Sequence, residues 1–186
     1  MAHPQRHPWI ISGPSGVGKG TVCARLTELH PEIHIPVSAT TRRPRPGEVD
    51  GVSYHFVSAM EFERLIASDE LLEHVVMFGA NSYGTLRSEV EQPLAKGRTV
   101  VLEIDLQGAR QVKRNMPEAR LVFLEPPSWD ELVRRLEGRG TEDEAAVASR
   151  LETARLELAA RDEADFVVVN EDIEETVRAL VSLMGL

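Results

Sequence analysis

The most informative segment of the sequence is Gly13-Pro14-Ser15-Gly16-Val17-Gly18-Lys19-Gly20, with the spacing G-x-x-x-x-G-K. It follows an apolar run, Trp9-Ile10-Ile11, that we expect to be a buried strand. It precedes Val22, Leu26 and Leu29, whose spacing predicts one buried face of a helix that stops at residues 30–31. A strand, a glycine-rich turn and a helix in this order are the context of a phosphate-binding P-loop. An ordinary glycine-rich turn is the alternative, and the lysine in this context disfavours it.

The physical chemistry of this segment suits binding of a nucleoside triphosphate. Glycines let the backbone approach the phosphates, and the N–H groups at the helix N-terminus present partial positive charge. Lys19 adds a full charge beside the transferred phosphate, so we assign it a catalytic role. We expect residues 13–21 to bind ATP. Gly20 stands after the lysine, where a P-loop usually has Ser or Thr. Magnesium would therefore be held mainly by phosphates and water, with help from Thr21.

Elsewhere, short strands alternate with helices, which predicts an α/β fold with a parallel sheet covered by helices on both faces. Segment 33–90 differs, because its short strands crowd together without long helices between them, and we expect it to form an inserted lobe. The predicted strands are 9–11, 33–37, 53–57, 71–77, 99–104, 120–124 and 166–169. Predicted helices cover 85–96, 106–115 and 173–183, and three more begin at the capping boxes Ser58/Glu61, Ser128/Glu131 and Thr141/Glu144, the last ending near residue 160. Residues 79–84 are predicted to be a loop.

The overall composition excludes several classes of protein. With 186 residues and 42% hydrophobic residues, the chain suits one compact domain. Its net charge of −9 disfavours broad nucleic-acid binding. Cys23 is the single cysteine, so we expect neither an internal disulfide nor a zinc site. Without a signal peptide or a membrane-spanning run, we expect a cytoplasmic protein and no membrane partner. The sequence carries no signal for an oligomeric state.

One basic cluster, Arg42-Arg43-Pro44-Arg45, has a spacing suited to a phosphate. Two arginines three residues apart in a proline-stiffened loop can both fork onto one dianionic phosphate. A solvated surface turn explains the same residues equally well from spacing alone.

Several further motifs occur in one order along the chain. They are Ser38-Ala-Thr-Thr-Arg42-Arg-Pro-Arg45-Pro-Gly-Glu-Val, Gly51-Val-Ser-Tyr54-His-Phe-Val, Tyr83-Gly-Thr85, Glu103-Ile-Asp105-Leu-Gln-Gly108, Pro126-Pro127-Ser128 and Arg135-Leu-Glu-Gly-Arg139-Gly. Together with the P-loop they resemble guanylate kinase over essentially the whole chain. The resemblance implies a core (about 1–32, 91–125 and 156–186), a lobe that binds GMP (about 33–90) and a helical lid (about 126–155).

The resemblance also implies an activity and a set of site residues. The reaction would be ATP plus GMP giving ADP plus GDP with Mg²⁺, in purine metabolism, with dGMP as a further candidate acceptor. Residues matching the phosphate-binding positions for GMP are Ser38, Arg42, Arg45, Tyr54 and Tyr83. Those matching the guanine-binding positions are Glu73, Thr85 and Asp105. The lid would supply Arg135, Arg139 and Arg150 to the transferred phosphate, Asn170 would contact adenine, and Glu103 would hold magnesium, directly or through water.

The chain departs from the family pattern at two places. Loop 79–84 is one residue longer than the commonest version, with Ser82 in place of the first of two tyrosines, and Glu103 stands where many relatives have Asp. The acceptor would be a phosphate oxygen that is already anionic, so we assign no histidine as a general base. Two alternatives remain: a ribose 1,5-bisphosphate phosphokinase, which would not need Glu73, Thr85 and Asp105, and a non-catalytic module that binds phosphorylated peptides.

Overall fold

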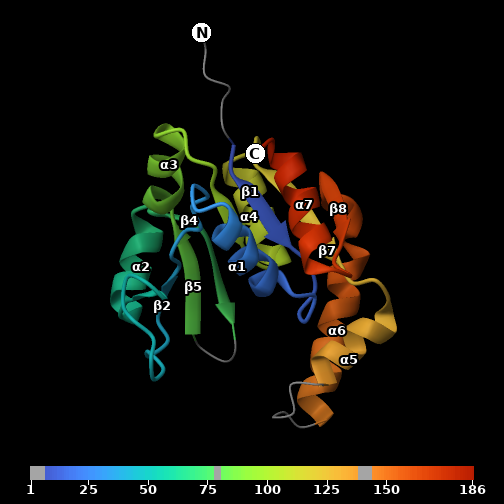
Figure 1. The fold of residues 1–186 in the computed structure, drawn as a ribbon. Coiled ribbons are helices and arrows are strands. Elements are labelled where there is room, and N and C mark those ends of the chain that lie inside the picture. Colours follow the sequence, from blue (N-terminus) through green and yellow to red (C-terminus); the bar gives the residue numbers. More distant parts are fainter. Residues whose placement is uncertain (1–6, 78–80, 138–143) are drawn as a thin grey trace. The chain divides into compact units, whose positions relative to one another are not determined.

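The structure, a computed structural model, describes residues 7–77, 81–137 and 144–186, which form two compact units (Figure 1). We call them the first unit and the second unit and describe each by itself. The first unit contains His7 and Pro8 together with Ile33–Leu102 and Gln107–Ala119. The second unit contains Trp9–Glu32, Glu103–Leu106 and the described residues of Arg120–Leu186.

A four-stranded sheet with the order β6-β1-β7-β8 carries the P-loop. Its strands are β1 (Trp9–Ser12), β6 (Val101–Glu103), β7 (Arg120–Glu125) and β8 (Phe166–Val169). β1 and β8 both pair with β7 in parallel. All four residues of β1 are buried, as expected for a central strand covered on both faces. The predicted α/β fold with a parallel sheet flanked by helices is confirmed.

Helices α1 (Lys19–Leu29) and α7 (Ile173–Met184) pack against each other in front of this sheet in Figure 1. The buried residues of α1 include Val22 and Leu26. Leu29, which we predicted on the same face, is 46% exposed because it lies in the last turn, beyond the packed part of the helix. A short 3₁₀ helix, η1 (Arg161–Glu163), precedes β8.

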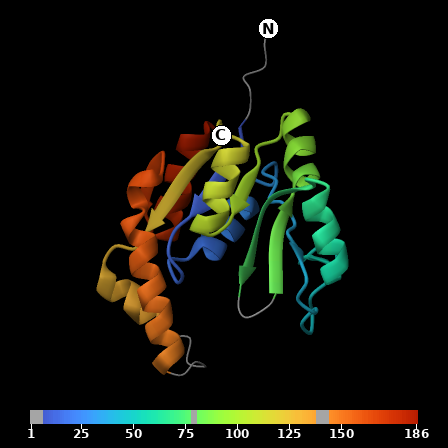
Figure 2. The ribbon, with the colours of Figure 1, turned by 180° about the vertical axis from the view of Figure 1, so that it is seen from behind.

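Helices α5 (Trp129–Glu137) and α6 (Glu144–Ala159) run side by side, as the view from behind in Figure 2 also shows. Leu132, Leu136 and Ala154 form the buried cluster between them. The backbone N–H of Glu131 donates to Ser128 Oγ at 3.2 Å, so the predicted cap of α5 is confirmed. The predicted cap at Thr141 lies outside the described residues.

The first unit contains a second four-stranded sheet, with the order β3-β2-β5-β4. Its strands are β2 (Ala39–Thr40), β3 (His55–Phe56), β4 (Leu71–Met77) and β5 (Asn81–Leu86). β5 is antiparallel to both β4 and β2, whereas β2 and β3 are parallel. Helices α2 (Ala59–Ala67) and α3 (Arg87–Ala95) belong to this unit, as does α4 (Leu106–Asn115) after its first residue. Ala39, Phe62, Leu65 and Leu71 form the core between α2 and the sheet.

The structure corrects several predicted boundaries in the first unit. Asn81–Gly84, predicted as a loop, belongs to strand β5, and Thr85, predicted in a helix, is in the same strand. The predicted strand 33–37 is wrong, because only His34 makes an isolated bridge, to Val100. Pro36 has no N–H to donate to a strand ladder. The predicted strand 53–57 is reduced to β3, preceded by an isolated bridge at Tyr54.

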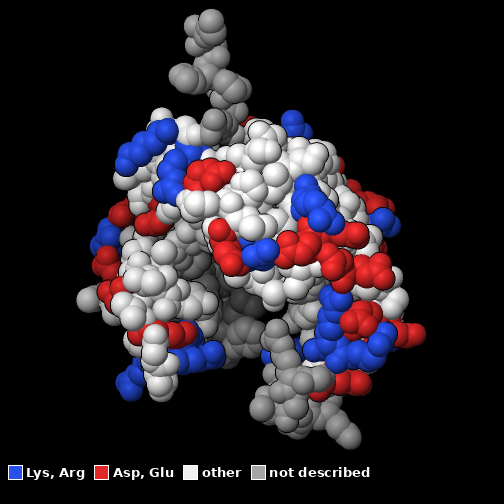
Figure 3. All heavy atoms as spheres, in the orientation of Figure 1, with Lys and Arg blue, Asp and Glu red and all other residues white. Residues whose placement is uncertain are grey.

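Acidic and basic side chains are interspersed on the face shown in Figure 3. Among the residues that the structure describes, no helix is both long enough and apolar enough to cross a membrane.

Candidate active site

The P-loop of the second unit is shaped by close contacts with the protein's own backbone. Gly13 has a φ of 145°, and a Cβ at this position would lie 2.4 Å from the carbonyl oxygen of Leu124 in β7. Gly18 has a φ of 100°, and its Cβ would lie 2.8 Å from Asn170 Nδ2. Both conformations strain an L-residue. Two of the loop's glycines are therefore required by the fold itself, in addition to any role in binding phosphate.

Lys19 begins helix α1 and turns its ammonium group back onto the loop. Nζ donates to the carbonyl oxygens of Gly13 at 2.6 Å and Pro14 at 3.2 Å. Burial lowers the pKa of Lys19, while the carboxylates of Glu157, Glu103 and Asp105 act in the opposite direction. The ammonium is thus held above the loop by backbone oxygens and lies within the field of three acidic side chains.

Glu103, at the end of β6, occupies the space left by the missing side chain of residue 20. A Cβ on Gly20 would lie only 3.3 Å from Glu103 Oε1. Burial raises the pKa of Glu103, and the charge of Lys19 opposes this increase. A carboxylate oxygen is a ligand that Mg²⁺ prefers, so Glu103 fits a magnesium ion held beside the P-loop.

The other predicted metal residue, Thr21, is exposed in the first turn of α1. Within 7–77, 81–137 and 144–186, no group of three or more His, Cys, Asp or Glu side chains is arranged to hold a metal ion.

Asn170 follows β8 and is 4% exposed. Its amide Nδ2 donates to the carbonyl oxygen of Val17 at 2.7 Å, and its Oδ1 accepts from Thr176 Oγ1 at 2.9 Å. These bonds connect the P-loop backbone, the end of β8 and helix α7. In this structure Asn170 supports the P-loop, and its predicted contact with adenine stays a prediction.

Arg135, on α5, also reaches the backbone of the P-loop. Its guanidinium donates to the carbonyl oxygens of Val17 and Asn170, each at 3.3 Å, and to Glu131 Oε1 at 2.9 Å. These contacts hold the side chain of Arg135 against the P-loop backbone and the end of β8. Arg150 is partly buried on α6. Arg139 lies outside the described residues.

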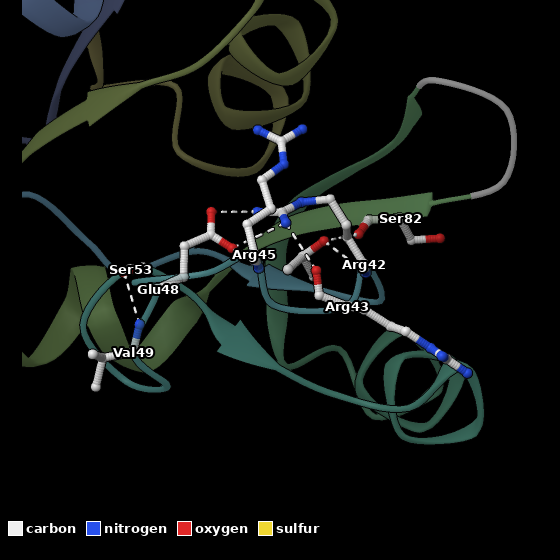
Figure 4. Close-up of polar contacts among 8 residues, drawn as sticks. Arg42, Arg43, Arg45, Glu48, Val49, Ser53 and Ser82 are labelled. Carbon is white, nitrogen blue, oxygen red and sulfur yellow. Dashed lines mark hydrogen bonds and ion pairs between the residues drawn. The ribbon is translucent and has the colours of Figure 1, made fainter.

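In the first unit, Arg42 is held in place by a carboxylate that we did not predict. Arg42 Nη2 and Nη1 bind the two oxygens of Glu48 at 2.7 and 3.0 Å (Figure 4). Glu48 also accepts from the backbone N–H of Arg45 at 2.7 Å, and these bonds lower its pKa, with Arg42 contributing most. The side chain of Arg43, to which we assigned no role, points away from Glu48 in Figure 4.

Aromatic rings flank the same guanidinium group. Arg42 Cζ lies 5.3 Å from the ring centroid of Tyr54 and 5.8 Å from that of Phe56. The rings of Tyr54 and Tyr83 meet edge to face, with centroids 5.9 Å apart. The hydrogen bonds to Glu48 raise the pKa of Arg42 most, and a hydrogen bond that Arg42 donates to the hydroxyl oxygen of Tyr83 acts in the same direction. The structure thus brings together three of the five predicted phosphate-binding residues, Arg42, Tyr54 and Tyr83.

The remaining two phosphate-binding residues lie on segments next to this cluster. Arg45 is exposed and shares Glu48 with Arg42 through its backbone. Ser38 lies just before β2, and its carbonyl oxygen accepts from the N–H of His55 at 2.9 Å.

Glu73 and Thr85 form a buried polar pair across β4 and β5. They are directly opposite in the strand register, and Thr85 Oγ1 donates to Glu73 Oε1 at 2.7 Å. Their residues are only 5% and 1% exposed. Asp105, the third predicted guanine-binding residue, belongs to the second unit. Its predicted role therefore rests on the resemblance, whereas the pairing of Glu73 with Thr85 is a feature of the structure.

Two residues of the site were missed by the sequence analysis. Glu48 lies six residues after Arg42 in a motif that we quoted, so a search for acidic partners of Arg42 could have found it. Glu157, on α6, accepts from the backbone N–H of Ser15 at 3.2 Å, across 142 positions of sequence. No local pattern signals that contact.

Comparison with known proteins gives a consistent result. The family model described as guanylate kinase matches residues 5–185. A guanylate kinase of Leifsonia xyli subsp. xyli is 57% identical over 180 residues, which cover 97% of this chain and 71% of the relative. One from Streptomyces coelicolor is 58% identical over 174 residues, covering 94% of this chain and 88% of the relative. The crystal structure of guanylate kinase from Anaplasma phagocytophilum, 35% identical, aligns with a TM-score of 0.77 and covers 100% of this chain and 87% of that one.

Proposed function

The chain belongs to the guanylate kinase family, and from this we propose that it transfers the γ-phosphate of ATP to GMP, giving ADP and GDP. The observation that carries the proposal is the P-loop, in which Lys19 is held by Gly13 and Pro14 at the start of α1. This arrangement supports binding of a triphosphate by backbone N–H groups, the helix N-terminus and the positive charge of Lys19.

The acceptor would be held by residues of the first unit. Arg42, fixed by Glu48, supplies a preoriented positive charge for a dianionic phosphate, and Tyr54 and Tyr83 supply neighbouring hydroxyl groups. The phosphate oxygen that attacks is already anionic near neutral pH, so the protein need not remove a proton. Its contribution is to position the acceptor in line and to neutralise charge in the transition state.

Selection of guanine would depend on the buried pair Glu73 and Thr85. Guanine carries two neighbouring N–H donors on one edge, and a carboxylate accepts from such donors. Adenine lacks this pair of donors, so Glu73 would gain no hydrogen bonds from that base in a buried place. A site of this kind can reject the wrong base by roughly 10⁴-fold.

Magnesium would neutralise the charge that develops on the phosphates during transfer. Glu103 is the residue of this chain best placed to help hold it, with Thr21 as the second candidate. Lys19 would stabilise the transferred phosphate. We also propose Arg135, Arg139 and Arg150 as partners of the same phosphate. The division of the chain into a core, a GMP-binding lobe and a lid is likewise a proposal.

The deciding experiment measures ADP formation from magnesium-ATP with six acceptors in parallel: GMP, dGMP, AMP, CMP, UMP and ribose 1,5-bisphosphate. We expect turnover with GMP, and with dGMP if the 2′-hydroxyl is not needed. Turnover with ribose 1,5-bisphosphate alone would replace the proposed acceptor and remove the role given to Glu73. A folded protein that turns over none of the six would contradict the kinase proposal.

A further inference from the structure

The contact between Glu157 and the P-loop is not explained by the proposed reaction. Glu157 lies on α6, far along the chain from the loop, yet its Oε2 accepts from the N–H of Ser15 at 3.2 Å. A P-loop binds phosphates with such backbone N–H groups. The carboxylate therefore uses an anion-binding donor of the loop for itself.

The same carboxylate is the acidic group with the largest electrostatic effect on Lys19, ahead of Glu103 and Asp105. Three acidic side chains thus act on a single ammonium group in a partly buried place. Burial raises the pKa of Glu157, because the surrounding protein keeps its carboxylate from water. The P-loop of this chain is accordingly much less electropositive than its glycines and lysine alone would make it.

This charge balance has a consequence for the ligand. A triphosphate without a metal brings several negative charges towards Glu157, Glu103 and Asp105. A triphosphate carrying a divalent cation brings less net charge and a positive centre that attracts the same carboxylates. Repulsion by like charges is strong in places that water screens weakly.

We propose that Glu157 is a specificity residue that makes the P-loop select the magnesium complex of ATP over metal-free ATP and other bare polyphosphates. The inference rests on the proposed function in one respect, because it takes ATP to be the ligand of the P-loop. It concerns binding alone and does not depend on which acceptor is phosphorylated.

The test measures binding of ATP to the full chain by titration calorimetry, without GMP, once with excess Mg²⁺ and once with a chelator. It compares the wild type with Glu157→Gln, whose amide oxygen can still accept from Ser15 but carries no charge. Glu152→Gln is the matched control, because Glu152 is exposed on the same helix and its replacement changes the net charge equally.

Removing one nearby negative charge should raise the affinity of Glu157→Gln for metal-free ATP about tenfold. The affinity for magnesium-ATP should change much less, so the ratio of the two affinities falls. Glu152→Gln should keep the wild-type ratio. Tripolyphosphate, which has no base or sugar, should show the same gain with Glu157→Gln.

An unchanged ratio in Glu157→Gln would overturn the proposal, and so would an equal loss of both affinities, which is the mark of a merely structural role. A similar fall in the ratio for Glu152→Gln would also overturn it, since net charge would then be the cause. If Glu157→Gln fails to fold, Glu157→Asp replaces it, because the shorter side chain withdraws the charge by one methylene. Its affinity for metal-free ATP should rise by a smaller factor, and an unchanged affinity would count against the proposal.

The outcome is distinguishable from a failure of the proposed function. If GMP is not phosphorylated but Glu157→Gln still gains affinity for metal-free ATP, the acceptor is wrong and the specificity role stands. If the wild type binds ATP under neither condition, both the P-loop assignment and this inference are overturned.

Discussion

At the scale of single residues, Lys19 is the side chain on which the proposed chemistry depends most. Replacing it with Ala removes the charge that would stabilise the transferred phosphate, so we expect turnover to fall by about 10²–10³-fold. The helix and loop around it are held by backbone contacts, so the circular dichroism spectrum should be unchanged. Lys96→Ala, at an exposed position just after α3, is the control for loss of one positive charge. Wild-type turnover in Lys19→Ala would contradict the role given to the P-loop.

Glu73 offers a second test at this scale, directed at the choice of base. Glu73→Gln keeps an oxygen that can accept from Thr85 but places N–H donors opposite the donors of guanine. We expect kcat/KM for GMP to fall by about 10- to 100-fold, since a hydrogen bond to a charged group is lost in a buried place. The KM for ATP should stay unchanged in steady-state kinetics. Glu63→Gln, exposed on α2, should behave as wild type, and a similar loss there would remove the argument.

At the scale of elements, the N-terminus of α2 shows a local signal that can be tested alone. The backbone N–H of Glu61 donates to Ser58 Oγ at 3.1 Å, as the sequence predicted. Ser58→Ala leaves that N–H without its cap, so the free energy of unfolding should fall by about 1 kcal/mol. Ser68→Ala, at the other end of the same helix, should change it by less than about 0.5 kcal/mol. Urea denaturation measures both, and equal effects would contradict the capping role.

The elements also show what the sequence could and could not predict. α4 and β8 have the predicted boundaries, and the ends of α7 and β7 differ from the predicted ones by one residue. These four elements could be predicted because their apolar periods and bounding residues are local signals. β5 was missed because its hydrogen bonds come from β4 and β2, and the polar run Asn81–Gly84 carries no strand period of its own. The same limit applies to the site: the P-loop is a contiguous motif, whereas the contact of Glu157 with Ser15 exists only in the folded chain.

At the scale of the whole molecule, the buried thiol of Cys23 makes the free energy of unfolding depend on pH. Its thiol is 1% exposed, and burial raises its pKa, with Glu103 contributing in the same direction. The folded state therefore keeps the proton to a higher pH than the unfolded state does. Stability from this group is present below the unfolded pKa of about 8.5 and is lost as pH rises above it.

Cys23→Ala removes this dependence and serves as the comparison for the wild type. Between about pH 8.5 and about pH 10, the wild type should lose about 1–2 kcal/mol more unfolding free energy than the variant loses. Denaturant titrations at both pH values measure the difference, and other groups that titrate in this range affect both proteins alike. An equal loss in the two proteins would show that the thiol is not held protonated by the fold.

The two compact units differ in where their tryptophans and tyrosines lie. Both tryptophans, Trp9 and Trp129, belong to the second unit, and both tyrosines, Tyr54 and Tyr83, belong to the first. Trp9 is buried beside Phe166, while Arg155 lies 4.9 Å from the ring centroid of Trp129. Light at the long-wavelength edge of absorption excites tryptophan alone, so its emission reports on the second unit. The tyrosine part of the absorbance, once separated from the overlapping tryptophan band, reports on the first. One unlabelled sample can therefore show whether the two units melt together or in succession.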